Sequence, residues 1–326
     1  MASNKAYLCV QGWGENTSGG EIGALVAGTG VSSIDDANAA TNGILGDYSV
    51  LNVTGTSAVF NTSLTLNPDD SALDGLVTVA ILGVRIQPLT QDTVMRATMT
   101  VGSTTYESAA AIYGQEMEKT LPAGTSGHEL FGSGLANIVF HDLPVSVLSS
   151  DVEFEIALDA GSLASTTVFI GSIFAGLQIP LQIAPGTFTW SSEPMNDRFT
   201  SRAGVNYSSN GVLHRVCTFD VQRAELETLH GIGADFYTDD IPKPNIFRAM
   251  IASIGQPMLF SPYPYPVTDA AWSGTVSNVD ERLLSVRQNF FCTYGLLDRS
   301  SQVSVREEGE GLGSTYRSRM RFGEVR

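Results

Sequence analysis

Short hydrophobic runs rich in Val, Ile, Phe and Thr recur along the first half of the chain, at the spacing typical of β-sandwiches and barrels. Helical periods are largely absent from this part of the sequence. The runs cover residues 49–53, 58–66, 76–86, 94–101, 136–143, 152–158 and 166–176. They predict a jelly-roll-like β-sandwich over residues 45–180.

Three of these runs also predict which face of each strand is buried. In the runs 94–101 and 152–158 every second residue is apolar, and the residues between include Glu153 and Glu155. Such alternation indicates strands with one buried and one solvated face, because successive side chains of a strand point to opposite sides. The run 76–86 is continuously apolar instead, which predicts a central strand covered on both faces.

The pattern changes after residue 180. Pro, Gly and Ser punctuate residues 181–197, so this stretch is the predicted linker, and 326 residues are enough for two cores. Residues 1–44 are dominated by small and polar residues and predict an extended N-terminal arm. We therefore expect a mainly β chain, with the sandwich followed by a smaller α+β domain over residues 198–326.

Two helices are predicted in this second domain. Asp220 is placed to cap a helix whose apolar stripe includes Leu226 and Leu229. A second helix begins at Pro244 and ends at Gly255. Strands are predicted on either side of the helices, over residues 212–219, 258–263 and 283–297.

The C-terminal segment alternates between apolar and basic residues, as expected of an amphipathic extended strand. Its members are Tyr316, Met320 and Phe322 on one face and Arg317, Arg319 and Arg321 on the other. Because the N-terminal half is acidic, we predict that this strand docks on a neighbouring subunit as an added β-strand, with complementary charge. These six residues are the candidate subunit interface.

Several motifs in the middle of the chain resemble those of structural proteins from tailed-bacteriophage tails. They are IG-x-IF-x-G from residue 170, R-x-x-x-R-x-G from residue 198, and an x-L-x-R strand leading into F-D and A-E-x-E-x-L between residues 212 and 229. As a pattern of elements the resemblance spans residues 75–300. It implies a minor tail or tail-tip protein of the virion with a galactose-binding-like jelly roll, assembled in the host cytoplasm from copies of itself and other tail proteins.

Acidic and basic residues are distributed unevenly along the chain, which favours a solvated acidic surface in the first half. Residues 1–180 hold 18 acidic and 4 basic side chains, whereas residues 181–326 hold 16 and 14. An acidic front half argues against binding to nucleic acid or to anionic membrane, since both need clustered Lys and Arg. The sequence also shows no secretory leader and no long apolar run, so we expect folding in the cytosol.

No catalytic, cofactor-binding or metal-binding constellation is predicted. Cys9, Cys217 and Cys292 are odd in number and lack metal-ligand spacing, so buried reduced thiols are expected. The acidic turn at Asp69, Asp70 and Asp74 lacks the register of a dedicated calcium loop, which favours a solvated turn over a calcium site. Neither the four histidines nor the Gly-rich residues 309–313 match a hydrolase or nucleotide motif.

Aromatic residues in Gly- and Pro-rich segments are candidates for contact with glycans or with other subunits. They are Trp13, Trp190, Tyr263, Tyr265 and Trp272. The prediction is thus a non-enzymatic virion component that acts through subunit packing. A carbohydrate-binding receptor module is the first alternative and a polysaccharide-degrading virion enzyme the second.

Overall fold

The protein is a mainly β chain in the part that the computed structural model describes. The described residues are 5–10, 21–43, 47–65, 76–87, 93–108, 111–113, 136–158, 161–182, 187–195, 198–200, 206–208, 212–224, 257–262, 292–297 and 316–324. Within these ranges nearly all secondary structure is antiparallel β-strand, and the only helices are short 3₁₀ turns, η1 (Ala39–Thr41) and η3 (Val145–Ser149).

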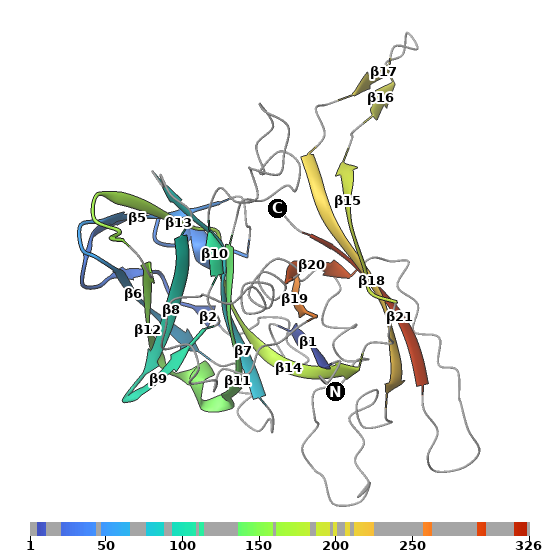
Figure 1. Ribbon diagram of the computed structural model, residues 1–326, viewed down its shortest axis with the longest axis horizontal. Coiled ribbons are helices and arrows are strands. Elements are labelled where there is room, and N and C mark those ends of the chain that lie inside the picture. Colours follow the sequence, from blue (N-terminus) through green and yellow to red (C-terminus); the bar gives the residue numbers. More distant parts are fainter. Residues whose placement is uncertain are drawn as a thin grey trace, which may run out of the picture.

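The larger of two main sheets has twelve strands drawn from both ends of the chain (Figure 1). Its strands are β1 (Lys5–Val10), β4 (Val31–Asp35), β5 (Ser49–Val53), β7 (Leu76–Gln87), β11 (Ala136–Pro144), β13 (Thr166–Ile170), β14 (Ser172–Gln182), β15 (Thr189–Met195), β18 (Val212–Ala224), β19 (Met258–Ser261), β20 (Thr293–Leu297) and β21 (Tyr316–Glu324). Their order is β15-β18-β21-β20-β19-β1-β14-β7-β13-β5-β4, and β11 pairs with β7.

The second sheet has seven shorter strands and forms the other layer of a sandwich. Its strands are β2 (Glu21–Ile22), β3 (Val26–Ala27), β6 (Ala58–Thr65), β8 (Thr93–Val101), β9 (Thr104–Glu107), β10 (Ala111–Tyr113) and β12 (Asp151–Leu158). A separate hairpin consists of β16 (Arg198–Thr200) and β17 (Asn206–Ser208), and Figure 1 shows it at the far end of β15 and β18.

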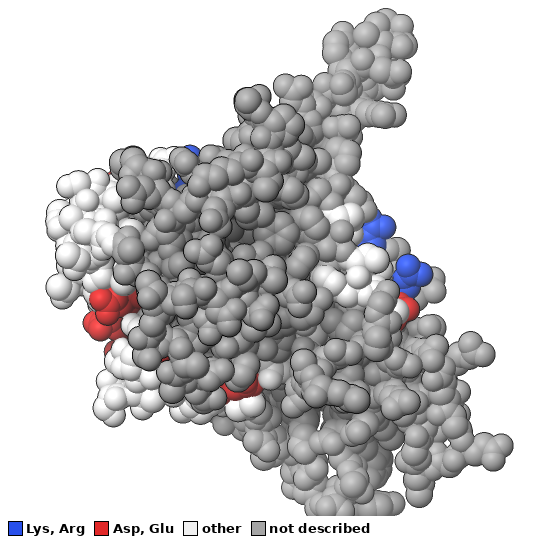
Figure 2. Space-filling view, in the orientation of Figure 1, with Lys and Arg blue, Asp and Glu red and all other residues white. Residues whose placement is uncertain are grey.

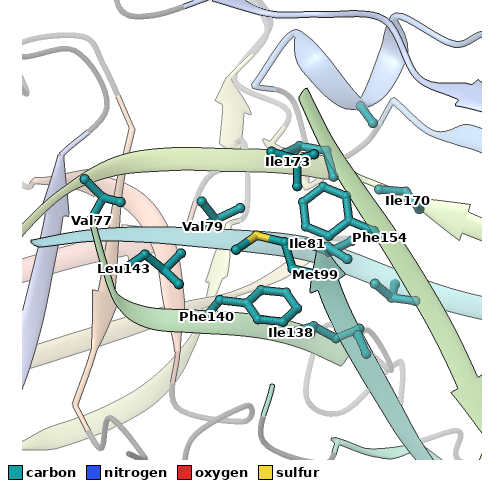
Figure 3. Close-up of a cluster of buried hydrophobic side chains, with 14 of the residues drawn as sticks. Val77, Val79, Ile81, Met99, Ile138, Phe140, Leu143, Phe154, Ile170 and Ile173 are labelled. Carbon is teal, nitrogen blue, oxygen red and sulfur yellow. The ribbon is translucent and has the colours of Figure 1, made fainter. Parts of the chain in front are cut away.

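The main hydrophobic core fills the space between the two sheets. Strands β7, β11 and β14 contribute one side of it, including Ile81 and Phe140, while β8 and β12 contribute Met99 and Phe154 from the other. Figure 3 shows these side chains pointing toward one another between the strands. The Phe154 ring lies 5.3 Å from that of Phe60 and 6.1 Å from that of Phe140, between centroids.

The predicted strand faces are confirmed. In β12 the residues Val152, Phe154 and Ile156 are buried, whereas Glu153 between them is exposed. The apolar run is β7, which is buried along nearly its whole length. It pairs with β11 on one edge and on the other with β13 and β14, which run in line and are separated by Gly171.

Within residues 1–44, the described part contains short strands that pair within this chain, together with turns and η1. β1 lies inside the large sheet, antiparallel to both β14 and β19, and β4 pairs with β5. The prediction of an arm rested on the many small and polar residues that follow β1. The apolar residues within β1 itself favour a buried strand. Ala6, Leu8 and Val10 belong to the main core.

Two further predictions need correction near the start of the second half. The predicted linker contains β15, which pairs with β18 from Thr189 to Met195. The predicted helix at Asp220 is wrong over its first residues, because β18 continues to Ala224. The alternation of buried Cys217, Phe219 and Val221 favours the strand over the local capping signal. The rest of that helix and the helix at Pro244 lie outside the described residues, and the division into two domains stays a prediction.

The first test addresses the sandwich core. Phe154→Ala should lower the free energy of unfolding by about 3–5 kcal/mol, because it removes a fully buried ring between the two sheets. Glu153→Ala changes the neighbouring exposed position of the same strand and should shift it by less than about 0.5 kcal/mol. Urea unfolding followed by circular dichroism measures both, and equal losses would contradict the assigned faces of β12.

Candidate functional site: a buried polar cluster beside β1

The far face of the large sheet, turned away from the sandwich core, carries a group of buried polar side chains. Alternation along β1 sends Leu8 into the main core and turns Tyr7 and Cys9 to the other face. Four neighbouring strands place polar groups beside them. We call the following six residues the polar cluster: Tyr7, Cys9, Thr78, His141, Gln178 and Ser261.

The hydrogen bonds of the cluster form one directed chain. Thr78 Oγ1 donates its only proton to Gln178 Oε1 over 3.0 Å, so it must accept from its other partners. Those partners are the Cys9 thiol at 3.2 Å and His141 Nδ1 at 3.0 Å. His141 therefore carries its proton on Nδ1, and Nε2 accepts from the Ser261 hydroxyl at 3.1 Å.

The chain ends at Asp142 on the exposed rim of the cluster. Gln178 Nε2 donates to the Asp142 carboxylate over 2.8 Å, and the Asp142 backbone N–H donates back to Gln178 Oε1 over 3.1 Å. The Asp142 backbone has a φ of 58°, in the left-handed region that Asp tolerates better than most residues. It lies at a register shift of β11 between Phe140 and Leu143. This bulge turns the carboxylate toward the cluster.

Burial sets the protonation state of the cluster. Desolvation lowers the pKa of His141 to about 4, although the charge of Asp142 acts in the opposite direction. Desolvation raises the pKa of the Cys9 thiol to about 12. It also raises the pKa of Tyr7, with the Asp142 charge as the next cause. At neutral pH the imidazole, the thiol and the phenol are all uncharged.

The ring of Tyr7 closes one side of the cluster. Its centroid lies 5.0 Å from that of His141, with an angle of 62° between the planes, which is an edge-to-face contact. A second group of apolar side chains continues the same face, including Phe174 and Tyr294, whose centroids are 6.0 Å apart. Aromatic rings and the strands themselves therefore surround the cluster.

The arrangement is suited to holding strands together. A serine hydroxyl 3.1 Å from a histidine nitrogen is the contact that activates a nucleophile in many hydrolases. Here Nδ1 of the histidine faces Thr78 instead of an orienting carboxylate, and Ser261 is 0% exposed. The chain of bonds joins β7, β11, β14, β1 and β19, which come from widely separated parts of the sequence.

The predicted interface strand is confirmed as extended, but its backbone is paired within this chain. β21 pairs with β18 from Tyr316 to Gly323, and its last residues also pair with β20. Met320 is buried in the chain's own core. The edge toward β18 is therefore used within this chain, and docking of β21 on a neighbouring subunit stays a prediction.

The exposed face of β21 carries its charged residues. Arg319 is 75% exposed and lies 3.9 Å from the Asp220 carboxylate on the paired strand, between Nε and Oδ1. Arg321 is half-buried on the same face. The side chains of Tyr316, Arg317 and Phe322 lie outside the described residues.

The other predicted residues fall largely outside the described part of the chain. Trp13, Tyr263, Tyr265 and Trp272 are among them, as are the three acidic residues at 69–74. Trp190 lies on β15, paired with Cys217, and its side chain is not described. The three cysteines are free and buried, as predicted. Across the described residues no three His, Cys, Asp or Glu side chains gather to hold a metal ion, and no helix is long and apolar enough to cross a membrane.

Sequence reasoning did not identify the polar cluster. Thr78 and Arg85 are the polar residues of the mainly apolar run 76–86, and His141 follows the apolar residues 138–140, which are the signals that the sequence offered. The sequence offers no comparable signal for Gln178 or Ser261. Their partners lie 100 and 120 residues away, at Thr78 and His141, so only the fold brings them together.

Comparison with protein-family models, with curated proteins and with solved structures gave no match to this chain.

The second test concerns pH. The pKa of His141 is about 4 in the folded chain, below its ordinary 6.5, so the unfolded chain binds this proton more readily. The stabilising contribution is complete above pH 6.5 and is lost as pH falls from 6.5 to 4. Wild type should lose roughly 3 kcal/mol of unfolding free energy through this group between pH 7 and pH 4.

His141→Asn keeps an N–H donor for Thr78 and should remove this part of the pH dependence, while lowering stability at pH 7. Urea unfolding at a series of pH values measures the difference. Phe154→Ala, which lowers stability without removing a titratable group, is the control and should keep the wild-type slope. An unchanged slope in His141→Asn would show that the buried imidazole does not govern acid stability.

Proposed function

We propose that this chain is a non-enzymatic structural component of a tailed-phage virion, in the tail or tail tip, and that it works by packing against other copies of itself and other tail proteins. The resemblance of the motifs between residues 170 and 229 motivates the phage setting. The distribution of charge over the described surface supports the packing role. The buried, uncharged state of the polar cluster favours a structural use of those residues over turnover of a substrate.

The outer face of the seven-stranded sheet is acidic. Asp151, Glu153 and Glu155 alternate along β12 on the side away from the core, and Glu155 shares a cross-strand row with Glu107 through Thr98. Like charges this close on one face repel one another, and a cationic partner relieves that repulsion. Figure 2 shows acidic side chains gathered on this side of the molecule.

The basic side chains of β21 lie on the opposite side. In Figure 2 two basic groups over β18 and β21 are on the right, beside a small acidic group, and a larger acidic group over β6 and β12 is on the left. Two complementary surfaces at opposite sides of one molecule permit a head-to-tail contact, which closes into a ring or continues as a filament. This separation of charge is the observation that carries the proposal.

The third test uses paired charge reversals. Glu153→Lys with Glu155→Lys, and separately Arg319→Glu with Arg321→Glu, should each weaken self-association roughly tenfold at low salt, with a smaller effect at high salt. Mixing the two reversed variants should restore association between them, because each then offers the other an opposite charge. Sedimentation velocity and negative-stain electron microscopy measure the assemblies.

Asp35→Lys, at the exposed end of edge strand β4, is the control for net charge and should assemble as wild type does. The head-to-tail contact is refuted if both reversed variants assemble like wild type, or if mixing them restores nothing. Mass spectrometry of purified virions, with localisation of the subunit by labelled antibody, tests the virion assignment separately.

A further inference from the structure

The large sheet consists of two halves that share no backbone pairing except through β1, as far as the described strands go. One half holds β4, β5, β7, β11, β13 and β14, all before residue 183, and the other holds β15, β18, β19, β20 and β21, all after residue 188. β1 lies between them, with Lys5–Val10 paired to β14 and Tyr7–Val10 paired to β19. We call these two pairings the β1 joint.

Side chains also pack between the halves. Buried residues of β18, β19 and β21, including Phe219, Phe260 and Met320, belong to the same hydrophobic core as the sandwich, and the rings of Phe174 and Tyr294 lie 6.0 Å apart. Ser261 on β19 bonds His141 on β11, and the Asn137 amide donates to the Cys292 carbonyl over 3.2 Å. Tyr294 donates to the Gly43 carbonyl over 3.3 Å. Single contacts of this kind contribute about 1 kcal/mol each. The ladder of β1 is the backbone pairing that joins the two halves among the described strands.

The close packing of β1 against β14 requires a glycine on β14. A Cβ at Gly176 on β14 would lie 2.4 Å from the Val10 carbonyl oxygen and 2.9 Å from the Phe174 ring. Both distances are shorter than real Cβ contacts allow, and a backbone atom cannot swing away as the end of a side chain can. Gly176 therefore gives a way to disturb the seat of β1 without altering β1 itself.

We propose that β1 is a clasp: its insertion between β14 and β19 fixes the C-terminal half of the sheet to the sandwich, and its withdrawal releases that half while the sandwich core stays folded. The sandwich part of the shared core is built from β6, β8 and β12 against β7, β11 and β14, all of which lie before residue 183. The released half carries β18 and β21 with it. This inference does not depend on the proposed role in a virion.

Hydrogen–deuterium exchange on the full-length protein tests the clasp. Gly176→Ala, and independently Cys9→Asp on the face of β1 turned away from the main core, should raise exchange in β19 and in residues 177–182 of β14 by about tenfold or more. Exchange in β6, β8 and β12 should stay within about twofold of wild type. Phe154→Ala is the control, because it weakens the sandwich core directly and should raise exchange in those three strands.

A disulfide that holds β1 against β14 provides a second test, which remains informative if the single variants fold poorly. Lys5 and Gln182 are directly paired between β1 and β14, so Lys5→Cys with Gln182→Cys should form a disulfide that ties β1 to its seat. Oxidation in the Gly176→Ala background should return exchange in β19 to near wild type, and reduction should reverse this. The clasp is wrong if exchange rises equally in all strands of both sheets, or if the disulfide leaves β19 unprotected.

Discussion

The architecture depends on one strand that pairs with partners far away in the sequence. β1 lies at the N-terminal side of the chain, yet it completes the ladder between β14 and β19. Both of its edges are used for backbone hydrogen bonds, one face enters the main core and the other enters the polar cluster. Without it, the edges of two half-sheets would be left unpaired in the interior, where each lost hydrogen bond costs about 1–3 kcal/mol.

The polar cluster gives this pairing its register. A shift of β1 by one residue would turn Tyr7 and Cys9 toward the apolar core and Leu8 toward Thr78 and Gln178. The cluster's donors and acceptors would then lose their partners, and unpaired polar groups in a buried site are expensive. The bonds among His141, Thr78 and Gln178 therefore select one alignment of strands, beyond any contribution to stability.

The sequence predicted the strands whose signal is local and missed the features whose cause is distant. Alternation along β12 and the unbroken apolar run of β7 follow from side-chain period and burial alone, and both are confirmed. Asp220 is a residue type that often caps helices. Here β18 pairs with β21 on both sides of Asp220, so the strand continues past it. The cluster depends on contacts between residues 63 to 120 positions apart in its core, such as Thr78 with His141 and His141 with Ser261. No local pattern specifies such contacts.

The position of β1 also sets an order of events during synthesis. A ribosome makes β1 before its partner β19, which ends at Ser261, about 250 residues later, and emerges tens of seconds afterwards at usual rates of elongation. Through that interval the apolar residues of β1 have at most one of their two neighbours. Such a strand is exposed to aggregation, and pairing at this sequence separation is intrinsically slow. The nascent chain is thus vulnerable at β1 until β19 is made, and chaperones that hold extended apolar segments are the factors on which its yield should depend.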